Sequence, residues 1–320
     1  MSRAATFVFV AFGSGLAAAM AVLAACNSSG TIVPAADAAA DAREEIVFFD
    51  GPTPYDSGAH PEASTEAAAD AADAGSGDAA AFGFVQFAQV PVGGGEFTAA
   101  FYGTPSPPPP GCSYELSDGG PCLVTTCPTH PANDAGPVSL VSAGALTVTG
   151  GAFGDSGIDI GPDNLGSYLY NTTGPMFSAG DTLTVSASGA TVPAFAPTSI
   201  VAPGSVTLTS PAQDSGVLTI PTTQDLAVAW TGGVTGARLI LDLSAAFTDG
   251  SSASAACSWD ASSGAGTIPA GALASLAGGT PQAGRSTAVW HQEAQMPVSA
   301  GRWTVVVRAY VSGASVATFQ

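Results

Sequence analysis

Lysine is absent from this chain, and only six arginines stand against 25 acidic residues, for a net charge of −19 over 320 residues. Without lysine there is no Walker loop, serine–lysine dyad or Schiff base. No serine has glycine both two residues before and two residues after it, which excludes the nucleophile elbow of α/β-hydrolases. So acidic a surface repels phosphates. We therefore expect no catalysis, no cofactor, no metal site and no nucleic-acid partner.

The N-terminus contains the one long apolar run, residues 4–25, with Arg3 as its only flanking charge. The run ends in Leu23-Ala24-Ala25-Cys26, a branched aliphatic residue, two small residues and a cysteine. This tetrad resembles the lipobox of bacterial lipoprotein precursors. The resemblance implies a thioether lipid on Cys26, cleavage just before it and acylation of the new amino terminus. Two or three acyl chains, at about 0.8 kcal/mol per buried CH₂, suffice for stable anchoring in a membrane.

Two other interpretations of residues 1–25 remain. A run of this length can span a bilayer, although its nine alanines and two glycines make it weakly hydrophobic. An ordinary secretory signal also ends in small residues. The lipoprotein interpretation explains the cysteine as well. Because Asn27 stands where aspartate is the usual inner-membrane retention signal, we expect the outer membrane, with the protein on its periplasmic face or on the cell surface.

Residues 26–80 form the second predicted region, a tether rich in alanine and aspartate. Residues 27–80 contain eleven acidic residues and only Arg43. Such a composition cannot bury enough apolar surface to offset the entropy of ordering, so we expect disorder. The exception is Ile46-Val47-Phe48-Phe49, which is either a disordered apolar patch or a strand that docks on a sheet edge.

From residue 81 onward, short runs alternate apolar and polar residues between glycine and proline turns. In Trp303–Val311, for example, odd positions are apolar, whereas Thr304, Arg308 and Tyr310 occupy even ones. This period of two predicts an all-β fold of the sandwich or barrel class. We expect one or two β-sandwich domains, with a β-domain at residues 81–196 and an immunoglobulin-like sandwich at residues 197–320. The only helix signal is Pro269 before the alanine-rich residues 270–276.

The chain as a whole is similar to a recurrent class of myxobacterial lipoproteins. The similarity rests on the lipobox, the tether and a set of motifs: Cys122-Leu-Val-Thr-Thr-Cys127, Ser178-Ala-Gly-Asp-Thr-Leu-Thr-Val-Ser-Ala-Ser-Gly189, Asp225-Leu-Ala-Val-Ala-Trp-Thr-Gly-Gly233, Cys257 and Gly266-Thr-Ile-Pro-Ala270. It covers nearly the full length. The resemblance implies the architecture and the location, and it implies no reaction.

Besides Cys26 the chain has four cysteines, Cys112, Cys122, Cys127 and Cys257. Outside the inner membrane an even set indicates disulfides. A hairpin turn at Gly119-Gly120 would set Cys112 opposite Cys127 and leave Cys122 for Cys257, which we favour. The two other pairings also join Cys257 to the 112–127 region. A zinc site with His130 is the rival interpretation, but the spacing C-x₂-C is missing.

Three further groups of residues are candidate sites. His291 and Glu293 share one face of a strand and suit acid–base chemistry, although a surface strand explains them as well. A glycine-rich loop contains four residues with oxygen atoms that could bind calcium: Asp155, Asp159, Asp163 and Asn164. Because they lack the alternating spacing of a calcium loop, we expect solvated turns there. Tyr168 and Tyr170 share a strand face and either stack on sugar rings or shield neighbouring strands.

The sequence therefore predicts a lipid-anchored protein of the cell envelope with a structural, adhesive or ligand-binding role. Its partners would be the membrane, through the lipid on Cys26, and an envelope polysaccharide or protein. Loops carry such contacts on sandwiches, and we expect them at residues 103–111, 244–256 and 280–287. The alternative is a secreted carbohydrate-directed hydrolase or carbohydrate-binding domain, which a pair of carboxylates on facing strands would favour.

Overall fold

The computed structural model describes residues 81–89, 94–103, 111–117, 120–128 and 139–320, together with the backbone of two strands near the N-terminus. These strands, β1 (Phe7–Gly13) and β2 (Ala17–Leu23), pair antiparallel. Cys26, residues 46–49 and His130 lie outside the described residues. In the described part of the chain, no helix has the length and apolar character needed to cross a membrane.

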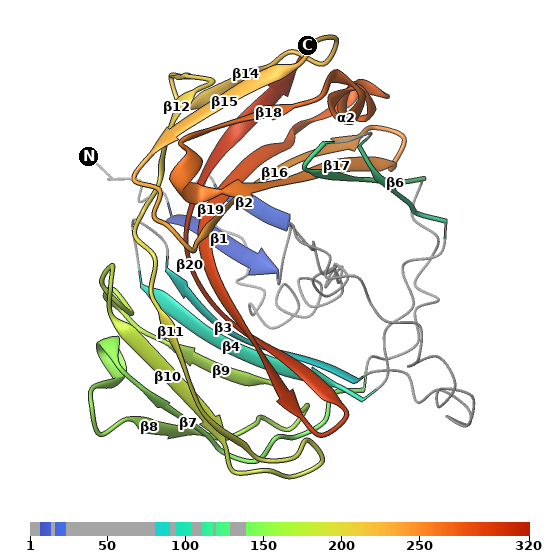
Figure 1. Ribbon diagram of the computed structural model, residues 1–320. Helices are drawn as coiled ribbons and strands as arrows, with labels where there is room; N and C mark the ends of the chain where they lie inside the picture. The colour runs from blue at the N-terminus through green and yellow to red at the C-terminus, as the bar shows by residue number, and fades with distance from the viewer. Residues whose placement is uncertain are drawn as a thin grey trace, which may run out of the picture.

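The described chain is all-β, with sheets packed face to face as in a sandwich, which confirms the predicted fold class (Figure 1). Eleven strands form the large sheet, and nine of them follow one another edge to edge. In sheet order these nine are β5 (Ser113–Leu116), β6 (Cys122–Cys127), β17 (Ser252–Asp260), β16 (Arg238–Phe247), β19 (Pro281–Ala300), β20 (Trp303–Phe319), β3 (Ala81–Gln89), β4 (Gly95–Tyr102) and β9 (Tyr168–Asn171). The other two are β13 (Gln213–Asp214) and β14 (Val217–Ile220).

Two smaller sheets pack on one face of the large sheet, at opposite ends (Figure 1). The sheet of lobe 1 consists of β11 (Phe195–Val201), β10 (Thr182–Ala187), β7 (Leu146–Thr149) and β8 (Ile158–Ile160). The sheet of lobe 2 consists of β12 (Thr207–Ser210), β15 (Leu226–Thr231) and β18 (Ala265–Ile268). Each lobe therefore has its own hydrophobic core, and both cores lie on the same face of the large sheet.

Short helices occur only at connections in the described ranges. They are η2 (Gly151–Phe153), η3 (Ala261–Ser263), α2 (Ala270–Ala274) and η4 (Ser275–Ala277). The last two confirm the helix expected after Pro269. Leu273 and Leu276 from this segment are buried in the core of lobe 2, so the helix closes that core beside the sheet.

The β19–β20 hairpin joins the two lobes, because each of its strands runs through both. Trp303, Val305 and Val307 of β20 are buried in the core of lobe 1, and Ala317 of the same strand is buried in lobe 2. On its other edge β20 pairs in parallel with β3 along Trp303–Val311 and with β14 along Val316–Phe319. The alternation in the sequence therefore places one face of a single strand, β20, in both cores.

The expected domain ranges 81–196 and 197–320 do not coincide with these cores. The boundary falls inside β11 (Phe195–Val201), which pairs with β10 in lobe 1. The β5–β6 hairpin precedes the boundary, yet β6 pairs with β17 of lobe 2. Both cores draw strands from either side of residue 196, because strand pairing joins segments far apart in the chain.

Candidate functional site

The large sheet has a second face, which carries neither core and is concave (Figure 1). Along each strand, residues of this concave face alternate with core residues. Asp242 of β16 stands between Leu241 and Leu243, both buried in lobe 2, and Arg308 of β20 stands between Val307 and Ala309 of lobe 1. The period of two therefore places charged side chains opposite the cores.

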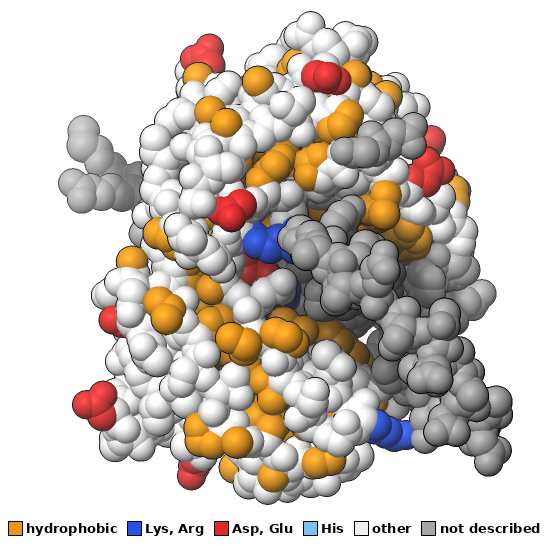
Figure 2. Space-filling model, viewed as in Figure 1, with side chains coloured by type: hydrophobic (Ala, Val, Ile, Leu, Met, Phe, Trp, Pro, Cys, Tyr) orange, Lys and Arg blue, Asp and Glu red, His pale blue; other side chains and the backbone are white. Residues whose placement is uncertain are grey.

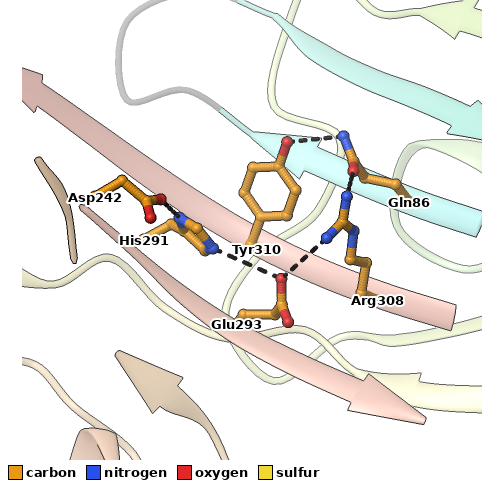
Figure 3. A network of polar contacts seen from close by, with 6 residues as sticks. All are labelled: Gln86, Asp242, His291, Glu293, Arg308 and Tyr310. Atoms are coloured by element: carbon orange, nitrogen blue, oxygen red, sulfur yellow. Dashed lines mark hydrogen bonds and ion pairs between the residues drawn. The ribbon is translucent and has the colours of Figure 1, made fainter. Parts of the chain in front are cut away.

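A network of six polar side chains from four adjacent strands lies on this face (Figure 3). Its members are Gln86 of β3, Asp242 of β16, His291 and Glu293 of β19, and Arg308 and Tyr310 of β20. Charged side chains of both signs also meet in a hollow at the middle of the view in Figure 2, with apolar side chains around them. The predicted shared face of His291 and Glu293 is confirmed.

His291 lies between two carboxylates. Its Nδ1 is 4.0 Å from Asp242 Oδ2, and its Nε2 is 3.6 Å from Glu293 Oε2. Arg308 Nη1 approaches the same Glu293 oxygen at 3.8 Å. The guanidinium also donates a hydrogen bond through Nη2 to Gln86 Oε1. The network thus alternates acidic and basic groups along its length.

Aromatic rings hold the cations of the network in place. The Arg308 guanidinium lies 5.6 Å from the centre of the Phe84 ring and 5.9 Å from that of Tyr310. Gln86 Nε2 donates to the Tyr310 hydroxyl at 2.8 Å, and the rings of Tyr310 and His291 are 5.0 Å apart. Cation–π contacts of this kind stabilise an arginine in a fixed orientation.

Burial separates the two carboxylates electrostatically. It raises the pKa of Asp242 from 3.8 to about 7, with Glu293 adding to the rise and the charges of His291 and Arg308 opposing it. Burial would also raise the pKa of Glu293, but the His291 ring 3.6 Å away and the charges of Arg308, His291 and Arg238 outweigh it and hold that pKa below its ordinary value. Glu293 is therefore the ionised member, and Asp242 takes up a proton near neutral pH.

Unpartnered polar atoms are concentrated on the concave face. Within the described ranges, six residues of this face have a buried polar side-chain atom without a hydrogen-bond partner; they are Thr125, Asp242, Ser258, Glu293, Arg308 and Ser312. They lie on five neighbouring strands, β6, β17, β16, β19 and β20. Since buried polar groups are nearly always hydrogen-bonded, their concentration on one face requires an explanation.

The exposed fractions of the side chains on this face are those in the full-length chain, which includes residues 1–25. The side chains of His291 and Arg308 are 14% and 21% exposed, whereas Asp242 and Glu293 are buried. Strand β2 contacts β19, and it lies within residues 1–25, which the lipobox predicts to be removed. A chain that begins at Cys26 lacks this contact.

A small cavity opens where the two lobes meet. Its lining includes Val206 and Leu208 beside Gln213, Trp290 and Gly313. Gly313 lies opposite Trp290 in the β19–β20 register, and a Cβ at residue 313 would stand 2.6 Å from the indole ring. Glycine at this position therefore leaves room for the ring.

The four cysteines of the described chain form two disulfides. Cys112 bonds to Cys127 and Cys122 bonds to Cys257, which is the pairing favoured from the sequence. The β5–β6 hairpin sets Ser113 opposite Thr126, so Cys112 and Cys127 meet at its open end. Cys122 and Cys257 face each other in the β6–β17 register. In the described residues no group of three or more histidine, cysteine or acidic side chains is arranged to hold a metal ion.

The remaining candidates take structural positions. Tyr168 is buried, and its hydroxyl donates to the Gly144 carbonyl and accepts from the Ala143 amide. Tyr170 is 37% exposed and packs against Phe153. The two share a face, as expected, but it is the face toward lobe 1, and Tyr168 is too buried to stack on a sugar.

Of the four residues of the acidic glycine-rich segment, Asp155, Asp163 and Asn164 lie outside helices and strands, as expected, whereas Asp159 lies in β8 (Ile158–Ile160). Asp163 Oδ1 accepts hydrogen bonds from the amides of Leu165 and Ser167, and Asp159 accepts one from the Thr147 hydroxyl. Asp155 and Asn164 are exposed. These oxygens are thus used locally and do not converge on one point.

The prediction of binding loops is wrong for two of the three segments, which are mainly strands. Residues 244–256 belong mainly to β16 and β17, and residues 281–287 belong to β19. Alanine and serine runs without large apolar residues read as loops in the sequence, but small side chains fit the closely packed β16–β17–β19 centre of the sheet. Residues 104–110 of the third segment lie outside the described part.

Sequence reasoning missed Asp242, Arg308, Gln86 and Tyr310 as partners of His291 and Glu293. A signal was present, because Asp242 and Arg308 are charged residues inside otherwise apolar strand runs. What the sequence lacks is the pairing of β20 with both β19 and β3. In comparisons with known proteins, no family model and no curated protein matches the chain.

Proposed function

We propose that this protein is a lipid-anchored, non-catalytic binding protein of the outer membrane, held through Cys26, and that the concave face of the large sheet is its binding face. One observation carries the second part. Most of the unpartnered buried polar atoms of the described chain lie on this face, with a charged network at its centre. Removing charged groups from water lowers stability when hydrogen bonds within the protein do not fully replace those to water. A bound partner would supply the missing hydrogen bonds.

The position of the network supports the proposal further. Arg308 and His291 are the more accessible members, and both are oriented by the groups behind them, Gln86, Tyr310, Glu293 and Asp242. Recognition groups held by packing and by further hydrogen bonds lose little entropy when a partner binds. The two lobes add rigidity, because both pack on the opposite face of the same strands.

The anchor has a direct test. Replacing Cys26 with serine removes the thiol that would carry the lipid, so the precursor should accumulate unprocessed. Mass spectrometry of the mature wild-type protein should show a lipid-modified residue 26 at the amino terminus. A mature terminus at another residue, or one without lipid, contradicts the anchor.

The binding face is tested with the unlipidated mature chain, residues 27–320. It should bind isolated cell-envelope material, and Glu293→Gln together with Arg308→Met should weaken that binding at least tenfold with little change in far-ultraviolet circular dichroism. Arg302→Met is the matched control, because Arg302 is exposed in the β19–β20 turn. Binding that survives the double variant, or that Arg302→Met removes as well, contradicts this face as the site.

A second candidate function, a carbohydrate-directed hydrolase, is favoured by the two carboxylates of the network. Asp242 has a raised pKa and Glu293 a lowered one, which is the division that general acid and nucleophile or base require. His291 lies between them. The hydrolase would release reducing ends from envelope glycans and lose this activity in both Asp242→Asn and Glu293→Gln; the binding protein would release none.

A further inference from the structure

The unpartnered atoms of the concave face define the length of what would meet them. They occur on β6, β17, β16, β19 and β20, five strands that follow one another in the sheet. Neighbouring strands lie about 4.8 Å apart, so this set spans roughly 19 Å across the strands. A partner that reaches all of them is extended and crosses the strands.

The charges of the face argue for a neutral partner. Glu293 lies within 4 Å of both His291 and Arg308, so cationic and anionic groups alternate over a short distance. An anionic ligand would meet Glu293 and a cationic one would meet Arg308, and in both cases like charges repel. A neutral partner avoids both penalties.

The unpartnered atoms also specify the hydrogen bonds of the partner. Asp242 Oδ1 needs a donor, and Glu293 Oε2 has its two cationic neighbours only at 3.6 and 3.8 Å, beyond hydrogen-bond distance. Arg308 Nε needs an acceptor, and the hydroxyls of Thr125, Ser258 and Ser312 take either role. A hydroxyl group is donor and acceptor at once. A chain that carries hydroxyls along its whole length therefore satisfies both kinds of atom wherever they occur.

Aromatic rings lie beside these polar atoms. Phe84 and Tyr102 form a stacked pair, with ring centres 6.4 Å apart and an interplanar angle of 30°, and Tyr310 lies on the neighbouring strand. These rings are buried, and the Arg308 guanidinium lies over those of Phe84 and Tyr310. They therefore fix the orientation of Arg308 on the binding face.

A peptide strand fits less well. Extended peptides join a sheet through the unpaired backbone of an edge strand. Here β17, β16, β19 and β20 are paired on both edges, so the face offers side chains only. The polar atoms in need of partners belong to side chains in the middle of the sheet.

We propose that the concave face binds a neutral, linear polysaccharide that runs across the strands from β6 to β20. This rests on the proposed function, because it takes the concave face as the binding face and names the chemistry of its ligand. The hydroxyls of several consecutive sugar units pair with Asp242, Glu293 and Arg308, and the rings of Phe84 and Tyr310 hold Arg308 in position.

The test uses the unlipidated mature chain, residues 27–320, in native gels that contain neutral β-glucan, xylan or mannan. Gels with polygalacturonate, an acidic polysaccharide, and with denatured casein serve as comparisons. At least one neutral polysaccharide should retard the protein, and the two comparison polymers should not. In titration calorimetry, affinity for oligosaccharides of that polymer should rise with chain length from two to about six units and then level off, because the binding face has a finite span.

The deciding variant is Thr125→Val, which removes one unpartnered hydroxyl at nearly constant volume and leaves nothing unpaired, so the fold should tolerate it. It should weaken oligosaccharide binding roughly three- to tenfold, as expected for one lost hydrogen bond. Thr126→Val is the matched control, because Thr126 is the next residue of β6 and points to the opposite face. Phe84→Ala should weaken binding as well, because it removes the ring that orients Arg308.

Several outcomes would overturn the proposal. Retardation by polygalacturonate or casein alone would assign an acidic or a polypeptide ligand. If Thr125→Val and Thr126→Val bind equally, the ligand lies elsewhere. If no purified glycan binds, while envelope material binds and is lost in the Glu293→Gln, Arg308→Met variant, the ligand class is wrong and the binding face stands. If envelope material does not bind either, both fail.

Discussion

The two faces of the large sheet follow opposite rules, although the same strands build both. Toward the lobes, β20 presents Trp303, Val305 and Val307, all buried in an apolar core. Toward the concave side it presents Thr304, Arg308 and Tyr310, of which two belong to the charged network. On the first face hydrophobic burial supplies the stability. On the second, buried charges with incomplete hydrogen bonding reduce it.

The difference teaches where this protein gives up stability. Charged networks in protein interiors can often be replaced by apolar residues at no loss of stability. In this protein the two lobe cores already stabilise the strands of the large sheet. A costly network on the remaining face is therefore best explained by what it contacts. The following predictions test whether the two faces really differ in this way.

The largest expected effect on stability comes from removing a disulfide. Cys122–Cys257, on the lobe side, closes a loop of 135 residues, and Cys112–Cys127 closes one of 15. In the chain-entropy model, replacing both cysteines of a pair with alanine should cost about 5 kcal/mol for the first and about 3 kcal/mol for the second. Urea unfolding measures both losses.

The pairing itself has a control. The oxidised chain 27–320 should show no reactive thiol when it is unfolded without reductant, and peptide mapping should join Cys257 to Cys122. Two or more labelled thiols would contradict the disulfides, and an equal loss of stability for the two pairs would contradict the ranking of the loops.

Truncation of a core aromatic is expected next in size. Trp303→Ala removes a buried indole that packs edge-on against Phe101, and it should lower the free energy of unfolding by about 3–5 kcal/mol. Thr304→Ala, one residue along and exposed on the other face, should change it by less than about 0.5 kcal/mol. Comparable losses in both variants would remove the distinction between the faces.

Asp242 makes the cost of the concave face depend on pH. Its pKa in the folded state, about 7, lies above its ordinary value of 3.8, so the folded chain retains a proton that the unfolded chain has already lost. The contribution to stability is complete below about pH 4 and is lost as the pH rises through about 7. Asp242→Asn should match the wild type near pH 4 and exceed its stability at pH 8 by up to about 4 kcal/mol.

Thermal and urea unfolding at several pH values check this prediction, with Asp155→Asn in an exposed turn as the control. A stability difference between Asp242→Asn and the wild type that stays constant from pH 4 to pH 8 would mean that the carboxyl does not titrate in this range. A loss of stability at pH 8 would mean that the charged form of Asp242 stabilises the fold.

The smallest expected effect lies where the two lobes meet. Gly313→Ala places a methyl group against the Trp290 ring, 2.6 Å from its nearest atom, and should cost about 1–3 kcal/mol by overpacking. Gly180→Ala is a poor control because its φ is +89°, whereas Gly271, in α2 with open space at its Cβ position, should tolerate alanine or gain stability. A neutral Gly313→Ala would show that the ring moves freely.

Much of the architecture was predictable, because it depends on local pattern. Period-two alternation gave the all-β class, the apolar odd positions of Trp303–Val311, and the shared face of His291 and Glu293. The Gly119-Gly120 turn gave the β5–β6 hairpin and with it the disulfide pairing. Pro269 marked the short helix. Each of these inferences needs only residues that are close in the sequence or the geometry of a single strand.

The tertiary structure determined which strands lie side by side, because strand pairing joins residues far apart in the sequence. Only the parallel pairing of β20 with β3, over 200 residues apart in the chain, brings Gln86 to Arg308 and Tyr310. Only the antiparallel pairing of β16 with β19 brings Asp242 near His291. Alternation says that a charged residue faces away from a core, but it does not say which strand lies beside it. The sequence by itself thus determined the elements and their two faces, while strand order, which loop-closure entropy and packing set jointly for the whole chain, determined the network.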